Sequence, residues 1–196
     1  MPTDPASPVA IRAVRESDAA DLLRIYAPYV ERTAVSFELE PPTVDEFAAR
    51  IRKVTSAWQW LVAERDGSPI GYAYGSTHRD RPAYRWSVEV TAYLHPDAQR
   101  QGIGRALYAR LFDDLAHLGY CSAFAGVTLP NDASVGLHTA VGFEPIGVFR
   151  SIGWKFGKWH DVAWFQRKLR EGNPPGLQPA GVRFAMQLQL PRAGSP

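Results

Sequence analysis

Gln99-Arg100-Gln101-Gly102-Ile103-Gly104-Arg105-Ala106 is the stretch of sequence that decides the fold. Its two glycines lie two positions apart between basic residues, and apolar residues recur at helical spacing directly after them. Glycines let a backbone approach an anion closely, and the free amides at a helix N-terminus attract phosphate oxygens. The stretch therefore predicts a phosphate-binding turn at the start of a helix.

Two common phosphate-binding motifs do not fit this turn. A dinucleotide fingerprint needs a third glycine where Leu107 stands, and an acidic residue after the next strand, where Gly126-Val127-Thr128 stands. A P-loop needs Gly-Lys-Ser or Gly-Lys-Thr after the turn, and the sequence has neither. The remaining expectation is a pyrophosphate whose extended, amide-bearing arm follows the edge of the preceding strand.

Outward from the turn, strand and helix patterns alternate along the chain. The predicted strands are 9–13, 58–63, 70–76, 85–94, 122–128, 144–149 and 162–169, with a hairpin turn at Asp66-Gly67. The predicted helices begin after a Ser17 cap, at a Thr43–Glu46 capping box, at Ile103 with a stop at Gly119, and at 133–141. Because strand 85–94 alternates, Glu89 lies on the face opposite Val88 and Val90. The order predicts a mixed α/β fold with one parallel crossover, from strand 85–94 through a helix to strand 122–128.

Composition limits the classes of protein to consider. The chain has 196 residues, 45% of them apolar, which suits one domain at 9–170 between polar or Pro/Gly-rich tails at 1–8 and 171–196. In the second tail the apolar patch 182–190 is a candidate docking segment. Lys and Arg number 22 against 20 Asp and Glu, so a nucleic-acid partner is not expected.

Cysteine and histidine usage argues against a metal site. There is one cysteine, Cys121, and the five histidines show no metal-ligand spacing, so we expect no metal and a reducing, cytoplasmic location. No apolar run reaches about 18 residues, so no membrane span is expected.

Six blocks of sequence carry a resemblance. Gln99-x-x-Gly102-x-Gly104 resembles the acetyl-CoA pyrophosphate loop of the GNAT acyltransferase superfamily. Five more blocks, together with it, resemble the phosphinothricin N-acetyltransferase family of that superfamily over about residues 9–169: Tyr84-Arg85-Trp86-Ser87-Val88-Glu89, Tyr93-Leu94-His95-Pro96, Leu129-Pro130-Asn131-Asp132, Leu137-His138, and the Gly153–Val162 segment. The resemblance implies the GNAT fold, with about seven strands in a mixed sheet, a splayed central parallel pair and flanking helices.

The resemblance also implies a reaction and its catalytic residues. Acetyl would pass directly from acetyl-CoA to the primary amine of a small amino-acid-like acceptor such as L-phosphinothricin, methionine sulfoximine or methionine sulfone. Glu89 matches the family carboxylate that takes the amine proton, and His138 stands where many acetyltransferases place a tyrosine beside the leaving sulfur. The sequence leaves open whether His138 acts as an acid, as a base or only structurally. A backbone amide near Tyr93 or Leu94 is the expected donor to the thioester oxygen.

Binding residues follow by the same correspondence. Those expected at acetyl-CoA are Tyr93, Leu94, His95, Arg100, Gln101, Gly102, Ile103, Gly104, Arg105 and Asn131. Those expected at the acceptor are Phe37, Arg79, Arg81, Tyr84, Arg85, Val90, Thr91, Lys155 and Trp159. The family further implies a homodimer.

Two other readings of the sequence remain. One is a GNAT enzyme for another amine, such as a polyamine, an aminoglycoside or a protein N-terminus. Because the loop 77–85 holds Arg79, Arg81 and Arg85 against Asp80 alone, it favours an anionic or zwitterionic acceptor over a polycation. The other is a non-catalytic acetyl-CoA-binding module, against which Glu89 and His138 argue.

Overall fold

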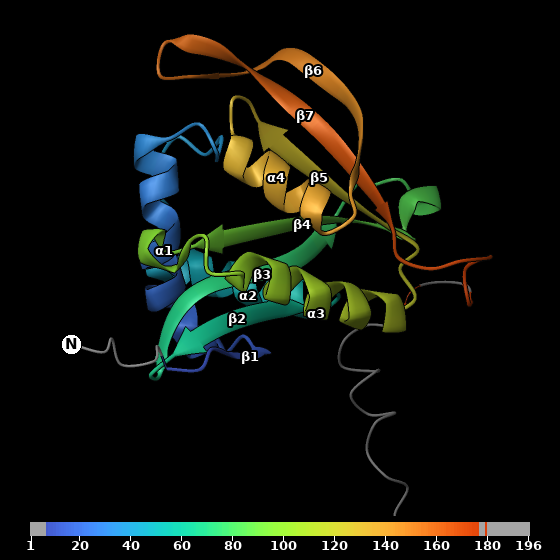
Figure 1. Ribbon diagram of the computed structural model, residues 1–196, viewed down its shortest axis with the longest axis horizontal. Coiled ribbons are helices and arrows are strands. Elements are labelled where there is room, and N and C mark those ends of the chain that lie inside the picture. The colour runs from blue at the N-terminus through green and yellow to red at the C-terminus, as the bar shows by residue number, and fades with distance from the viewer. Residues whose placement is uncertain (1–6, 177–178, 180–196) are drawn as a thin grey trace, which may run out of the picture.

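In residues 7–176 and 179, which the computed structural model describes, seven strands form one mixed sheet (Figure 1). The strands are β1 (Ala10–Ala13), β2 (Trp60–Arg65), β3 (Ser68–Thr77), β4 (Ser87–Leu94), β5 (Ser122–Thr128), β6 (Glu144–Lys155) and β7 (Lys158–Lys168). The helices are α1 (Ala19–Arg32), α2 (Val44–Thr55), α3 (Ile103–His117) and α4 (Asp132–Ala140). The strand order is β1-β2-β3-β4-β5-β7-β6, and only the β4–β5 pair among these is parallel. The mixed α/β prediction with its central parallel crossover is confirmed.

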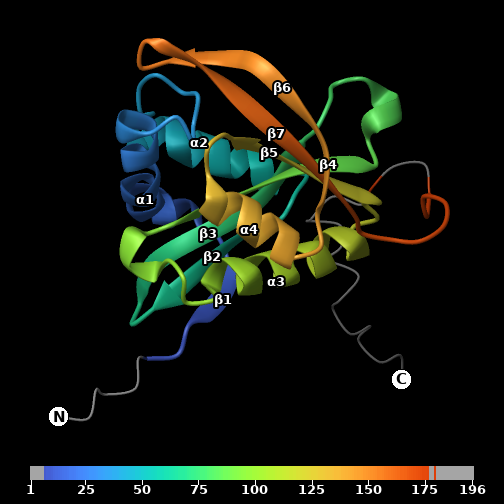
Figure 2. The ribbon, with the colours of Figure 1, turned by 45° about the horizontal axis from the view of Figure 1, so that its top comes forward.

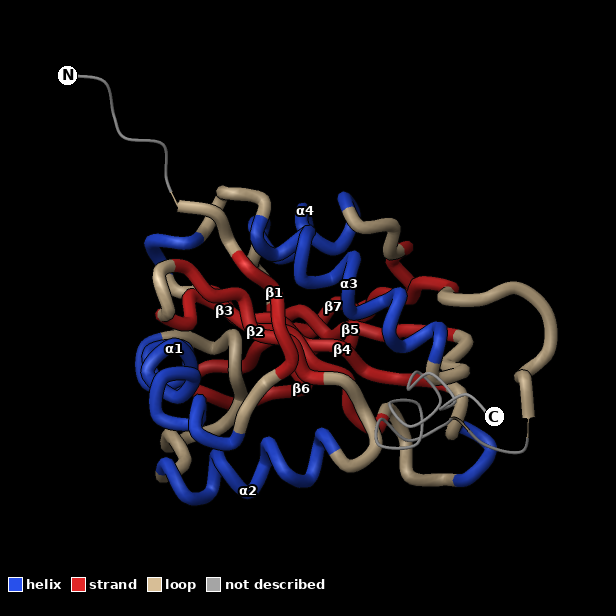
Figure 3. Tube along the Cα trace, turned by 90° about the horizontal axis from the view of Figure 1, so that it is seen from below, coloured by secondary structure: helices blue, strands red, loops and turns tan. Residues whose placement is uncertain are grey.

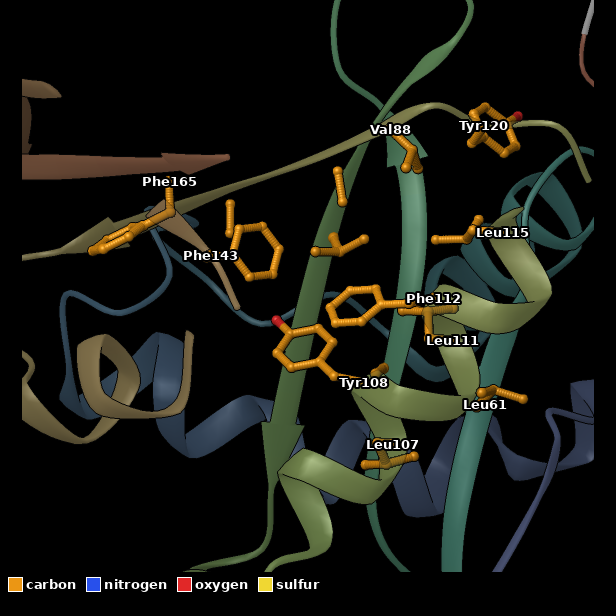
Figure 4. Close-up of a cluster of buried hydrophobic side chains, with 14 of the residues drawn as sticks. Leu61, Val88, Leu107, Tyr108, Leu111, Phe112, Leu115, Tyr120, Phe143 and Phe165 are labelled. Carbon is orange, nitrogen blue, oxygen red and sulfur yellow. The ribbon is translucent and has the colours of Figure 1, made fainter. Parts of the chain in front are cut away.

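The helices form two layers, with α1 and α2 on one face of the sheet and α3 and α4 on the other (Figures 2 and 3). The apolar stripe of α3, with Leu107, Leu111 and Leu115 fully buried, packs on Val88 and its neighbours (Figure 4). On the opposite face, Trp60, Tyr72 and other buried aromatic side chains fill the space under α1 and α2. The central strands are therefore covered on both faces, which fixes β4 in place.

The parallel pairing of β4 and β5 is short. It covers Ser87 with Ser122, Val88 with Ala123, and Glu89 with Phe124. From there β4 runs on to Leu94 paired with β3, while β5 runs on to Thr128 paired with β7. The two strands diverge beyond Glu89, as Figure 1 shows, and the expected splay is confirmed.

Of the local sequence signals, the capping box and the hairpin turn are confirmed and the helix cap at Ser17 is not. The capping box is present, because the Thr43 side chain accepts from the Glu46 amide. The hairpin turn is also present, with Asp66 and Gly67 at φ 51° and 76°. The expected Ser17 cap is wrong. A short 3-10 turn over Glu16–Asp18 comes first, and the Asp18 carboxylate accepts from the Arg15 amide at 2.6 Å.

The last hairpin is longer than the sequence pattern predicts. β6 extends to Lys155 through an irregularity between Phe149 and Gly153, where Ser151 has φ 48°. β7 begins at Lys158 rather than at residue 162. The apolar patch 182–190 lies outside the described residues. None of the helices in the described part of the chain is long and apolar enough to cross a membrane.

Candidate active site

The candidate site begins where β4 and β5 separate. Beyond Glu89 the edge of β4 that faces β5 turns its backbone groups toward a gap. An extended ligand with amide groups can pair with such an edge as an additional strand would. Tyr93 and Leu94 end this open edge, where the sequence predicted a backbone donor and a cofactor contact.

Contacts from α1 hold the end of β4 in position. The hydroxyl of Tyr29 donates to the Leu94 carbonyl at 2.6 Å and accepts from the Gln99 side chain at 3.2 Å. His95 donates its backbone N–H to the Ile70 carbonyl, and its ring accepts from the Asp97 amide in the short turn that follows. Tyr29 was not predicted, because no local pattern links a helix residue to a strand about 65 positions away.

The glycine turn has the backbone geometry of an anion site. Gly102 precedes α3 with φ 79°, and a side chain placed on it would meet no other atom within 4 Å. Gly104 lies buried against Leu137 of α4, where a Cβ would come within 3.0 Å of that side chain. The first amides of α3 have no partner within the helix, because its hydrogen bonds begin with Ala106 donating to Gly102. Open space above free amides fits a pyrophosphate.

The flanking residues of the turn divide into two groups. Arg100 and Arg105 are exposed beside the turn, and Arg100 itself has φ 59°. Gln101 is tied into the loop, since its amide donates to the Asp97 carbonyl and accepts from Arg65. Ile103 is buried under α3, so its side chain anchors the helix start. Two cations beside open amides suit a phosphate group.

Asn131 lies at the other side of the gap. It caps α4, with its side-chain oxygen accepting from the Ser134 amide at 3.1 Å. It also lines a hollow of about 750 Å³ between the α1–α2 link, the end of β5 and the β6–β7 hairpin. Trp159 lines the same hollow, so the structure brings one expected cofactor residue together with one expected acceptor residue.

Glu89 occupies the point of divergence. Its side chain is 31% exposed, and burial raises the pKa of its carboxyl while Arg79 acts in the opposite direction. His78, which follows β3, comes within 3.6 Å of it, from imidazole Nδ1 to carboxylate Oε2. A carboxylate with a raised pKa at the mouth of the gap suits proton abstraction near neutral pH. His78 was not predicted, because it belongs to none of the blocks that carry the resemblance.

The β3–β4 loop gathers the expected basic residues. Arg79, Arg81, Tyr84 and Arg85 together line a hollow of about 500 Å³ beside Trp58 and Tyr120. Arg79 also lies over the Trp164 ring, 5.6 Å from its centroid. This concentration of positive charge favours an anionic ligand group.

Three other residues expected at the acceptor lie outside the basic β3–β4 loop. Val90 is 3% exposed within the α3-side core, on the face opposite Glu89, so its side chain is a core residue. Thr91 is half-buried on the Glu89 face, opposite Tyr74. Phe37 covers Gly153 of β6 and is 39% exposed.

Lys155 has a structural role instead of the expected acceptor contact. Its side chain is buried, and Nζ donates to the Val30 carbonyl at 2.7 Å and to the Ser36 carbonyl at 2.8 Å. These bonds fasten the β6–β7 hairpin to the end of α1 and to the α1–α2 link. Burying a cation is costly unless it has hydrogen-bond partners, and the two carbonyl groups supply them to this ammonium.

His138 also lies inside the core. Its Nδ1 meets the Ser134 carbonyl at 2.7 Å and its Nε2 meets the Tyr108 hydroxyl at 3.2 Å, so both ring nitrogens have partners. Burial lowers the pKa of the imidazole, and the Phe165 ring stacks against it. Of the roles that the sequence left open, this geometry favours the structural one.

Within the described residues, no three His, Cys, Asp or Glu side chains gather where a metal ion could be held.

Three features of the site point to one class of enzyme, which binds acyl-CoA and acylates an amine. They are the splayed parallel pair, the glycine turn and the carboxylate where the two strands diverge. The chain matches the family described as Acetyltransferase (GNAT) domain over residues 11–164.

The chain is similar to named N-acetyltransferases. It is 39% identical to phosphinothricin N-acetyltransferase of Streptomyces viridochromogenes, over 86% of this chain and 92% of that protein. It is 32% identical to the L-methionine sulfoximine/L-methionine sulfone acetyltransferase of Salmonella typhimurium, over 85% and 98%. The crystal structure of a GNAT superfamily phosphinothricin acetyltransferase from Sinorhizobium meliloti in complex with AcCoA superimposes with a TM-score of 0.84 at 34% identity, covering 90% of this chain and 98% of that one.

The chain belongs to the GNAT acetyltransferases and, within them, to the phosphinothricin N-acetyltransferase family. It is an acetyl-CoA-dependent acyltransferase, as the sequence predicted.

Proposed function

We propose that the enzyme acetylates the primary amine of a small amino-acid-like acceptor of the phosphinothricin, methionine sulfoximine or methionine sulfone type. The observation that carries the proposal is the half-buried Glu89 at the divergence of β4 and β5, with Arg79 acting on it from the basic loop. An amino-acid analogue presents an amine to be acetylated and anionic groups to be held. The carboxylate can take the proton of the amine, and the arginines can bind the anionic groups.

The roles of the residues follow from their places in the fold. Glu89 accepts a proton from the acceptor ammonium, which frees the nitrogen lone pair. Acetyl-CoA supplies the thioester acetyl group, and the amides at the start of α3 with Arg100, Arg105 and Asn131 are the proposed holders of its phosphate end. A backbone amide at Tyr93 or Leu94 stabilises negative charge on the thioester oxygen.

A panel of amines tests the acceptor. We expect L-phosphinothricin, methionine sulfoximine and methionine sulfone to release CoA thiol from acetyl-CoA, followed colorimetrically, with kcat/KM far above that for spermidine, an aminoglycoside or a short peptide. Turnover of only the cationic amines or the peptide would contradict the proposed acceptor and leave the chemistry in place. No release of CoA thiol with any amine, while acetyl-CoA still binds, would favour a non-catalytic binding module.

We propose that the enzyme is a homodimer whose contact includes the β6–β7 hairpin. The hairpin forms the end of the sheet and exposes large apolar side chains. They are Ile146, Val148, Phe149, Ile152, Trp154, Phe156 and Trp159, each 38–59% exposed. A surface this apolar on an edge strand is typical of a protein interface.

Sedimentation or light scattering tests the dimer. We expect the parent protein at micromolar concentration to have twice the mass of the chain, and Ile152→Lys to shift it toward the single-chain mass, because a charge in an apolar contact is costly. The control is Leu39→Lys, at a residue that is 74% exposed on the α1–α2 link. A parent of single-chain mass, or equal dissociation by the control, would contradict the proposed contact.

We also propose that the functional domain runs over residues 9–170 and that the enzyme acts in the cytoplasm. The family match over 11–164 and the lone Cys121 support these two points.

A further inference from the structure

His78 lies face to face with an aromatic ring in the candidate active site. Its imidazole stacks on the Phe124 ring with centroids 4.1 Å apart and planes 8° apart, and Trp164 of β7 stands edge-on at 5.9 Å. Phe124 is the β5 partner of Glu89 in the last parallel pair. The stack therefore brings the imidazole from the end of β3 to the carboxylate at the point where the sheet opens.

The contact between the two side chains is specific in its atoms. Imidazole Nδ1 is buried and has no hydrogen-bond partner in the described part of the chain, and Glu89 Oε2 is 3.6 Å from it. The imidazole side chain is only 10% exposed, so water has little access to it. A buried ring nitrogen without a partner is costly, and a small movement gives this one an acceptor.

Protonation states follow from the neighbours of the pair. Burial and the positive charge of Arg79 both lower the pKa of His78, which favours the neutral imidazole. Tyr84 of the same loop has its ring 6.5 Å away, while β5 and β7 contribute the neutral rings of Phe124 and Trp164. A neutral imidazole has one N–H, and an ionised carboxylate can only accept, so only the tautomer with hydrogen on Nδ1 can donate to Glu89.

We propose that His78 is a positioning residue for Glu89: held flat on Phe124, its neutral imidazole donates from Nδ1 to carboxylate Oε2. Oε1 is then left to accept the proton of the acceptor ammonium. In this step one N–H bond of the acceptor breaks, Glu89 becomes a carboxylic acid, and His78 keeps its own proton. The inference rests on the proposed role of Glu89 as the base.

Two substitutions separate the donor from the stack. His78→Phe keeps an aromatic ring against Phe124 and removes the N–H, whereas His78→Asn loses the ring and retains an amide N–H near the place of Nδ1. A hydrogen bond to the ionised carboxylate lowers its pKa, so its loss raises that pKa. We expect His78→Phe to lower kcat about 10- to 100-fold, a part of what a positioned base contributes, with the KM for acetyl-CoA unchanged. We expect the acid limb of the pH–rate profile to move to higher pH.

The conservative variant and a direct titration complete the test. We expect His78→Asn to restore kcat to within a few-fold of the parent and to return the acid limb to its place. The ¹³C titration of the Glu89 carboxyl by NMR, in protein without added ligand, should show the same upward pKa shift in His78→Phe. An unmoved Glu89 titration in His78→Phe, or equal impairment by Phe and Asn, would overturn the inference.

The failure of the proposed base is distinguishable from the failure of this inference. If Glu89→Gln retains parent activity, Glu89 is not the base and His78 has nothing to position. If Glu89→Gln is inactive while His78→Phe matches the parent in rate and titration, only the role of His78 is overturned. When both roles hold, His78→Phe causes no further loss of kcat in a Glu89→Gln background.

Discussion

We expect Glu89→Gln to lower kcat by about 10²- to 10⁴-fold, the usual contribution of a positioned general base, and to leave the affinity for acetyl-CoA unchanged. The amide has nearly the shape of the carboxylate but cannot accept the proton of the ammonium. Glu89 lies at the mouth of the gap, whereas the proposed phosphate site lies at the start of α3, so the two functions separate. Steady-state kinetics with the best acceptor of the panel and calorimetric titration with acetyl-CoA measure the two quantities.

The pH dependence follows from the same carboxyl. Burial raises the pKa of Glu89, and the base works only when ionised, so we expect kcat/KM to rise with pH through a value above that of a free glutamate.

The control for Glu89→Gln is Glu64→Gln, on β2 and paired with Arg12, which removes a carboxylate remote from the gap. Equal loss of turnover and of acetyl-CoA affinity in Glu89→Gln would contradict the assignment of the base.

We expect Gly102→Val to weaken the binding of acetyl-CoA severely. At φ 79° a β-branched residue is strained, and its side chain enters the open space above the turn where a phosphate group would lie. Losing two charge-assisted hydrogen bonds, at about 1.5 kcal/mol each, weakens binding more than about 100-fold. Titration with acetyl-CoA measures the dissociation constant, and thermal unfolding measures the strain.

Gly67 supplies a matched control. It has φ 76° in the β2–β3 turn, and a side chain there would also meet nothing within 4 Å. Gly67→Val therefore carries a similar backbone strain outside the glycine turn, and we expect a similar fall in melting temperature with normal acetyl-CoA binding. Normal affinity in Gly102→Val, or equal loss in Gly67→Val, would show that close approach at the turn is not what binds the cofactor.

Much of the fold could be predicted because its signals are local. The alternation of apolar residues in β4 places Val88 on the α3 face and Glu89 on the other, as the structure has them. The glycine turn could be predicted because the residues that form it are adjacent in sequence. The β6–β7 hairpin was underestimated because its apolar residues face outward and Ser151 adopts a left-handed conformation, so the alternation of a half-buried strand is lost.

The site was less predictable because side-chain partners depend on packing between distant segments. Lys155 bonds to carbonyls 119 and 125 positions away, and nothing near it in sequence shows that its ammonium is buried. His78 reaches Glu89 only because Phe124, on a strand beyond the crossover, provides the ring on which it lies. His138 reads as a catalytic histidine by its place in a motif, while Tyr108 of α3 and the Ser134 carbonyl occupy its nitrogens.

The end of the parallel pairing at Glu89 constrains how such an enzyme can change over generations. One position of β4 supplies the proposed base and also marks where the strand edge becomes free. An insertion or deletion of one residue within β4 would turn Glu89 toward α3 and expose Val88 or Val90 in its place, so the reaction would be lost outright. We expect changes of length to be better tolerated outside this strand, in exposed connections such as the β3–β4 loop. A change of acceptor would then leave the length of β4 fixed and alter the loops around it.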